Sequence, residues 1–194
     1  DTATTELLID NLADDDSSVR YWAAEALKGN PSTAVKNAAI QLARNEEKRT
    51  TALCGILLEH QVDSLQPVFE TILREALGGQ ITGPYRLDWE RCSVEYLSTY
   101  PRPEHRQLFV TLLENKDTDC FVKRDAALGL GRLKDTSSVP LIVDVLLEGS
   151  KASDFNSQAF LVALSYIGDD RCRRVIELAL GSESEPVRQL ARQL

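Results

Sequence analysis

The most constraining feature of this sequence is a short apolar pattern that returns six times. Each copy centres on a small residue, and the six centres are Ala23, Ala52, Ser93, Ala126, Ala159 and Ala191. A bulky apolar residue stands four positions before every centre except the second, which has Lys48 there, and an apolar residue stands four positions after each of the first five centres. Residues spaced by four share one face of an α-helix. Each copy therefore predicts a helix with a bulky, small, bulky stripe, whose small centre lets a neighbouring helix approach closely.

The spacing of these centres predicts a repeat architecture. The steps between them are 29, 41, 33, 33 and 32 residues. A second apolar helical pattern lies before most centres, as in TELLIDNLA at residues 5–13 and PEHRQLFVTLLE at residues 103–114. Self-similarity at such a period is typical of helical repeat proteins, and strand signals are almost lacking. We therefore expect an all-α protein, a right-handed α-solenoid of about six two-helix repeats, in which residues 1–194 form one domain.

Two corner segments carry a family resemblance. DDDSSVRYWAAEAL at residues 14–27 and DTDCFVKRDAALGLGRL at residues 117–133 each place acids before a Val-Arg or Val-Lys pair and then a pair of alanines. This order resembles the short HEAT-like repeats of the phycobilisome lyase type. The resemblance implies the helical repeat fold. In that family some members attach bilin chromophores to phycobiliproteins and many others look like interaction scaffolds.

The charges at the corners predict helix caps and ion pairs. Acidic residues precede each stripe, and their side chains can accept hydrogen bonds from the first free N–H groups of a helix. Basic residues recur close behind them, at Arg20, Arg49, Arg91, Lys123, Arg124 and Arg188. We expect these cations to form a ladder that pairs with carboxylates of the same or a neighbouring corner.

Composition and motifs argue against several functional classes. A formal net charge of -8 disfavours a general nucleic-acid binder, and no apolar run is long enough to span a membrane. Cys54, Cys92, Cys120 and Cys172 are too far apart for a zinc cage, so we expect reduced thiols and a cytoplasmic protein. His60 and His105 belong to no metal-spaced cluster, and GLGRLKD at residues 129–135 is better explained as a helix end than as a phosphate loop. We expect no catalytic residue, cofactor or metal.

The longest step between centres contains a candidate binding segment. The insertion GGQITGPYRLDWER, at about residues 78–91, brings helix breakers together with Tyr85, Arg86 and Trp89, which are residue types favoured at binding hot spots. Trp89 also fits the bulky position of its stripe, which would make it a core residue. Tyr21 and Trp22 flank the first stripe, and Tyr21 and Arg124 are further candidate contacts along the inner helices.

These features predict a non-enzymatic scaffold or adaptor that binds another protein on its concave surface. The alternative is a bilin-lyase-like or chromophore-handling protein that acts on phycobiliproteins. The final segment EPVRQLARQL, residues 185–194, carries its apolar residues to the end of the sequence. It therefore predicts self-association through the C-terminal repeat or cover by another segment.

Overall fold

The described part of the chain is entirely helical. A computed structural model describes residues 2–59, 63–80, 86–149 and 154–194, and these contain twelve α-helices and four 3-10 helices with no strand. The predicted all-α class is confirmed for these residues. The chain folds into two compact units, unit 1 (Asp1–Tyr96) and unit 2 (Leu97–Leu194), and each unit is described by itself.

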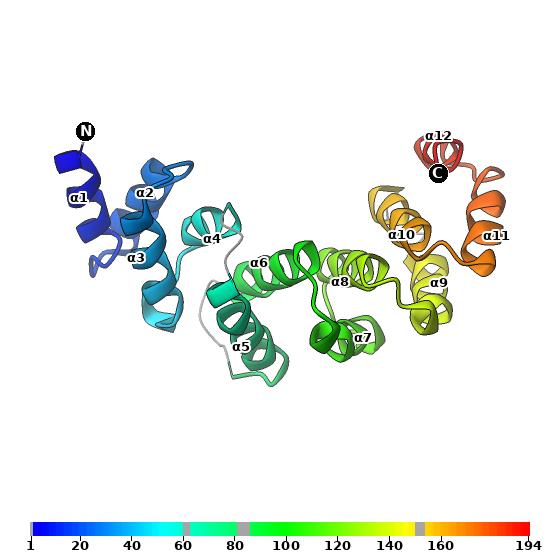
Figure 1. Ribbon diagram of the computed structural model, residues 1–194, viewed down its shortest axis with the longest axis horizontal. Helices are drawn as coiled ribbons and strands as arrows, with labels where there is room; N and C mark the ends of the chain where they lie inside the picture. Colours follow the sequence, from blue (N-terminus) through cyan, green and yellow to red (C-terminus); the bar gives the residue numbers. More distant parts are fainter. Residues whose placement is uncertain (1, 60–62, 81–85, 150–153) are drawn as a thin grey trace. The chain divides into compact units, whose positions relative to one another are not determined.

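Unit 1 is built from helices that pack on the preceding helix or on the helix two places away in the chain. Helix α2 contacts both α1 and α4, and α3 contacts α4 (Figure 1). A stacked pair of rings, Phe69 and Tyr96, lies in its core with centroids 4.4 Å apart. The helices are α1 (Thr2–Asn11), α2 (Ser17–Leu27), α3 (Thr33–Ala43), α4 (Thr51–Leu58), α5 (Gln66–Leu77) and α6 (Arg86–Thr99), whose last residues belong to unit 2, with 3-10 turns at Glu46–Lys48 and Asp63–Leu65.

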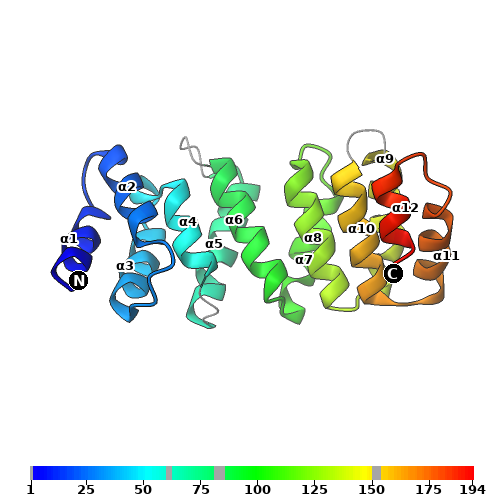
Figure 2. The ribbon, with the colours of Figure 1, turned by 90° about the horizontal axis from the view of Figure 1, so that it is seen from above.

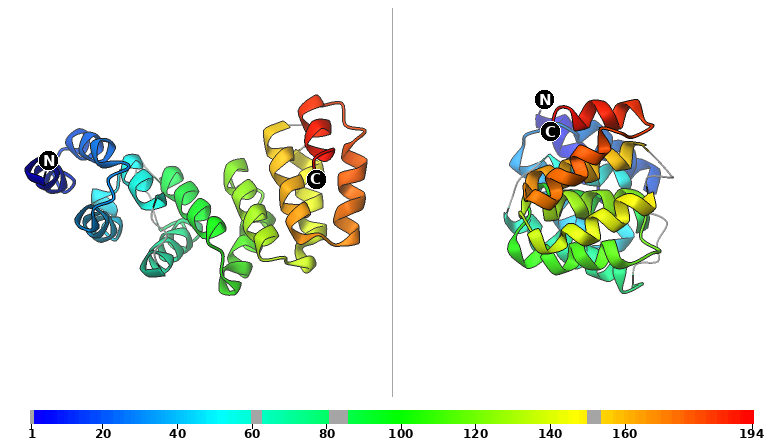
Figure 3. Two further views of the ribbon diagram at one scale, coloured as in Figure 1. Left: turned by 45° about the horizontal axis from the view of Figure 1, so that its top comes forward. Right: turned by 90° about the vertical axis from the view of Figure 1, so that its right-hand side faces the viewer.

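Unit 2 has two layers of helices. The first helix of each repeat belongs to one layer, and the second helix, which carries the stripe, packs on it. Helices α8 and α10 lie side by side, with α7 against α8 and α9 against α10 (Figure 2). Helices α11 and α12 pack onto α10 at the end of the unit (Figure 3). The helices are α7 (Arg106–Glu114), α8 (Cys120–Arg132), α9 (Val139–Gly149), α10 (Asp154–Ile167), α11 (Asp170–Ala179) and α12 (Glu185–Ala191), with 3-10 turns at Pro103–His105 and Thr136–Ser138.

The predicted stripe centres are core residues in five of six cases. The five are at most 6% exposed: Ala23, Ala52, Ser93, Ala126 and Ala191. Ala159 is only partly buried, because the buried face of α10 is shifted by one residue toward Phe160, Ala163 and Leu164. Val19 also departs from the prediction, at 36% exposed.

Close helix approach in unit 2 depends on glycine. The segment at residues 129–135 does end a helix, since α8 finishes at Arg132, yet Gly129 and Gly131 lie inside the helix and are buried. A Cβ atom added at Gly131 would lie 2.6 Å from the carbonyl oxygen of Ala163, and one at Gly129 would lie 2.6 Å from the ring of Phe109. These two positions therefore let α8 pack closely on α10 and α7.

The helix caps follow the prediction at some corners and differ at others. Asp16 and Asp119 cap α2 and α8, accepting from the backbone N–H groups of residues 18 and 121 at 2.7 and 3.0 Å. Helices α4 and α12 are capped by the hydroxyls of Thr50 and Ser184 and not by the acidic side chains predicted for this role. A short hydroxyl side chain reaches the free N–H groups more easily than the longer glutamate does.

Three corner arginines share a contact that the ion-pair prediction did not anticipate. Arg20, Arg49 and Arg188 each stand three residues before a stripe centre, and each donates to the carbonyl six residues earlier, that of Asp14, Ala43 or Ser182. We call this contact the corner clasp. In it the guanidinium donates to a backbone carbonyl of its corner, and Arg49 and Arg188 also pair with Glu75 and Glu185.

The first clasp also joins two successive corners of unit 1. Arg20 Nη1 donates to Asp14 O at 2.8 Å and to Asp15 O at 2.9 Å, while Nη2 reaches Glu47 O in the next corner at 3.2 Å. Lys48 of the second corner also joins the two corners, because its Nζ lies 2.7 Å from the Asp15 carboxylate of the first. Ion pairing between corners is therefore present here, with the buried guanidinium at its centre.

Candidate protein-binding surface

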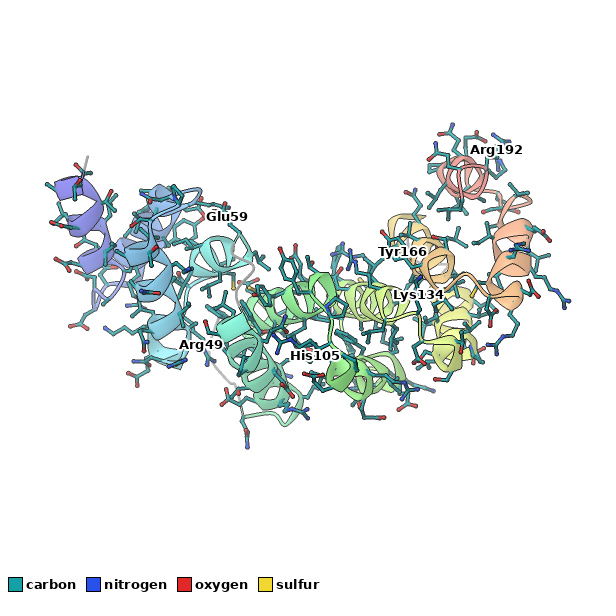
Figure 4. All side chains as sticks on the ribbon, in the orientation of Figure 1. Arg49, Glu59, His105, Lys134, Tyr166 and Arg192 are labelled. Carbon is teal, nitrogen blue, oxygen red and sulfur yellow. The ribbon has the colours of Figure 1, made fainter. Side chains whose placement is uncertain are left out.

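The residues predicted to bind a partner have different environments. Tyr85 lies outside the described residues. Arg86 begins α6 and is exposed, and its Nη2 lies 3.5 Å from the carbonyl oxygen of Ala76. Trp89 is 1% exposed and packs beneath the Arg49 guanidinium, 5.5 Å from its ring centroid (Figure 4). Trp89 is therefore a core residue and not a surface contact, because it fills the bulky position of its stripe.

Tyr21 and Arg124 occupy the same place in their repeats. Each stands two residues before a stripe centre, and at about 100° per residue this position faces away from the stripe. Tyr21 is 37% exposed and contacts Trp22 edge to face, with centroids 5.3 Å apart. The Arg124 guanidinium lies 5.3 Å from the ring centroid of Phe121.

A strip of aromatic, aliphatic and arginine side chains covers the solvent face of α8. Phe121, Arg124, Leu128 and Arg132 follow one another at intervals of three or four residues, so they share the helix face opposite the buried stripe. Across the helix pair, Tyr166 in the last turn of α10 lies under the Arg132 guanidinium, with 5.8 Å between that group and the ring centroid (Figure 4). We call these five residues the α8 strip.

The two arginines of the α8 strip are held in place by their neighbours. Arg124 donates through Nε and Nη2 to the Asp125 carboxylate at 2.8 and 2.9 Å, and Asp125 is itself buried. Arg132 Nη1 donates to the carbonyl of Ser98 at 2.7 Å, in the last turn of α6, where the helix dipole favours a cation. Both guanidinium groups are thus positioned over aromatic rings before any partner arrives.

Four of the five residues of the α8 strip were missed in the sequence: Phe121, Leu128, Arg132 and Tyr166. The two aromatic residues carried no predicted role, because an aromatic residue in a helix usually points to the core. Phe121 and Tyr166 are instead 37% and 43% exposed. The available signal was positional, since Phe121 stands five residues before its stripe centre and so lies off the buried face.

Unit 2 also contains two cavities that flank α11. One, of about 340 Å³, is lined by Asp169, Cys172 and Leu194 among others, and the second, of about 290 Å³, is mostly apolar and includes Leu147 and Leu178. Both volumes are at the lower end of the range for small-molecule pockets. Among the described residues no group of three or more His, Cys, Asp or Glu side chains is arranged to hold a metal ion. In the same part of the chain, every helix is too short or too polar to cross a bilayer.

Comparison with known families identifies a repeat that includes part of the α8 strip. Residues 122–148 match the family described as PBS lyase HEAT-like repeat. The chain contains a HEAT-like repeat. The matched segment runs from α8, which carries most of the α8 strip, through most of α9, and it confirms the resemblance drawn from the corner at residues 117–133. A search of curated proteins returns no match.

Proposed function

We propose that this HEAT-like repeat protein is a non-enzymatic scaffold or adaptor that binds another protein through its second helices. In this proposal the helix pairs stack as one right-handed solenoid of about six repeats, and the second helices line its concave surface. The observation that carries the proposal is the α8 strip, in which exposed aromatic rings and positioned guanidinium groups lie together on the adjacent helices α8 and α10.

The chemistry of the α8 strip is the chemistry of interface hot spots. Aromatic and arginine side chains dominate binding energy when a partner buries them, and each can contribute about 2 kcal/mol or more. Because Arg124 and Arg132 are already held by Asp125 and Ser98, less side-chain entropy is lost on binding. The remaining predicted contacts, Tyr85, Arg86 and Tyr21, are proposed as additional contributors.

Alanine substitutions in unit 2 test the proposal. A partner is first identified by affinity purification, and its dissociation constant is measured by calorimetry with Phe121→Ala, Tyr166→Ala and the control Leu147→Ala. Leu147 is 62% exposed on α9, which is a first helix, so Leu147→Ala also truncates a large exposed side chain but on the other layer of helices. We expect the first two variants to weaken binding at least tenfold and the control to leave it unchanged. If both strip variants bind normally while Leu147→Ala abolishes binding, the first helices are the interface.

The chromophore-handling alternative is decided by a separate experiment. Co-expression of the chain with a bilin and a phycobiliprotein subunit should give no covalently coloured product if the protein is a scaffold. Covalent colour would show that the alternative is correct and that the α8 strip serves an apoprotein substrate.

Two further properties belong to the same proposal. The protein is placed in the cytoplasm, in keeping with its four free cysteines, three of which are buried. Self-association is proposed through α12 and the residues that follow it, where Leu194 is 46% exposed beside the larger cavity. Sedimentation of the parent and of Leu194→Asp would test this, since the substitution should shift any dimer toward monomer.

A further inference from the structure

The second helix of unit 1 exposes an apolar face that no described element covers. Val19, Trp22 and Ala26 follow one another at helical spacing on α2, and all three are exposed. Trp22 is 68% exposed, and its ring is held edge to face by Tyr21, itself 37% exposed. Leaving two large rings in water is unfavourable, so a surface of this kind usually marks a binding site. We call these four residues the α2 face.

The surroundings of the α2 face are strongly acidic. Residues 2–28 contain six acidic and two basic side chains, so this segment carries an excess of four negative charges, half of the chain's formal net charge of -8. One of the two bases, Arg20, is buried and donates to backbone carbonyls in its corner clasp. The other, Lys28, lies 3.9 Å from Glu25.

Two of these six carboxylates, on α1, form no ion pair that would occupy them within the described part of the chain. Asp16 caps α2, Asp14 accepts from the N–H of residue 16, and Asp15 pairs with Lys48. In contrast, Glu6 and Asp10 are exposed on α1, which packs against α2, and neither forms an ion pair within the described part of the chain. Glu25 is one helical turn from both rings, three residues after Trp22 and four after Tyr21.

We infer that the α2 face is a second docking surface, and that its occupant is a lysine- and arginine-rich segment of a partner protein that also presents apolar side chains. Charge complementarity selects this occupant. A cation over the face of an exposed Trp gains a cation–π attraction, and the surrounding carboxylates attract the same charges. A second copy of this chain fits less well, because two acidic surfaces of the same sign would meet. This inference rests on residues of unit 1 and on none of the α8 strip; Tyr21, proposed above as an additional contact, is its one residue in common with the proposed function.

A peptide titration with the intact protein tests the charge and the apolar parts together. The probe is a fluorescein-labelled peptide of alternating lysine and leucine pairs, and its control has glutamate in place of lysine. Binding is followed by fluorescence anisotropy, and the shielding of Trp22 is followed by acrylamide quenching. We expect the basic peptide to bind and to protect Trp22, the glutamate peptide not to bind, and affinity to fall as salt is raised.

Three variants locate the site. Trp22→Ala should weaken binding of the basic peptide at least tenfold, and Glu6→Gln combined with Asp10→Asn should weaken it severalfold and reduce its salt dependence. The control is Leu178→Ala, which truncates a side chain that is 78% exposed on α11 and belongs to neither surface, and it should leave peptide affinity unchanged. Binding that is insensitive to Trp22→Ala would overturn the inference. So would a dimer of this chain, detected by sedimentation, in which Trp22 is shielded from acrylamide. A failure of Tyr166→Ala to affect the partner of the α8 strip would overturn the proposed function alone.

Discussion

A glycine-to-alanine change at the contact between α8 and α10 should show how unit 2 is held together. The added Cβ at Gly131 would lie 2.6 Å from Ala163 O and 2.8 Å from Ala163 Cα, and both atoms belong to the backbone of α10. No side-chain rotation relieves such a contact. The helices must move apart by roughly 0.8 Å to restore an ordinary distance of about 3.4 Å, and a gap of that size removes about a quarter to a half of the local dispersion energy.

The magnitude follows from two opposing effects. Separation of α8 and α10 weakens the packing of buried residues such as Leu130 and Leu164, and overpacking of this kind costs about 1–3 kcal/mol or somewhat more when backbone must shift. Alanine regains about 1 kcal/mol in helix propensity. We therefore expect Gly131→Ala to lower the free energy of unfolding by about 2 kcal/mol.

Gly55 in α4 supplies the matched control. A Cβ at Gly55 would meet only the far end of the Lys28 side chain, at 2.9 Å from its Cε, and that chain can move aside. Gly55→Ala should therefore stabilise the protein by up to about 1 kcal/mol. Urea unfolding followed by circular dichroism gives both values, and hydrogen exchange of α8 amides assigns the loss to unit 2. If Gly131→Ala were as stable as Gly55→Ala, the close approach of α8 and α10 would not be a stabilising contact.

Four other changes test separate parts of the structure. Arg20→Ala removes a buried cation from three carbonyl contacts and should cost about 2–4 kcal/mol in urea unfolding, whereas Arg20→Lys should recover part of the loss; equal stability of all three proteins would contradict the corner clasp. Ala126→Leu should cost about 1–3 kcal/mol by overpacking a fully buried position, which thermal unfolding would report. Lys134 has a φ of 55°, so Lys134→Gly should raise stability by about 0.5–1 kcal/mol, and a loss of stability would show that its side chain has another task. Hydrogen bonds from Arg171 lower the pKa of Asp169 to about 2, so its ionised form stabilises the fold above about pH 4 and this contribution is lost as pH falls toward 2; Asp169→Asn should flatten that part of the curve of urea midpoint against pH.

Most of the helical stripe could be predicted from sequence because it follows the register of the helix, and Val19 and Ala159 are the exceptions. Residues four positions from a centre lie only about 40° from it around the helix, which is why Trp89, Leu27 and Leu130 are all buried. Trp22 stands one residue before its centre, about 100° away, and is exposed. A tryptophan is therefore a core residue in one repeat and a surface residue in another, according to its position relative to the stripe centre.

The candidate site was harder to predict because exposure depends on how neighbouring helices pack. Tyr166 lies close to the buried face of α10 by register, yet it is 43% exposed, whereas the next residue, Ile167, is buried. The pairing of its ring with Arg132 joins residues 34 positions apart in the sequence, and no local pattern specifies such a contact. Tyr21 and Arg124 were accessible to prediction because both stand opposite the stripe.

The corner clasp gives three corners of the chain the same local structure although the repeats differ in length. The steps between stripe centres vary from 29 to 41 residues, so a contact that spanned a whole repeat would change its geometry from one repeat to the next. A guanidinium that binds the carbonyl six residues earlier depends only on the loop and the first turn of the helix behind it. The surfaces of the second helices are then the part of the fold on which binding residues such as Phe121 and Trp22 can differ from repeat to repeat.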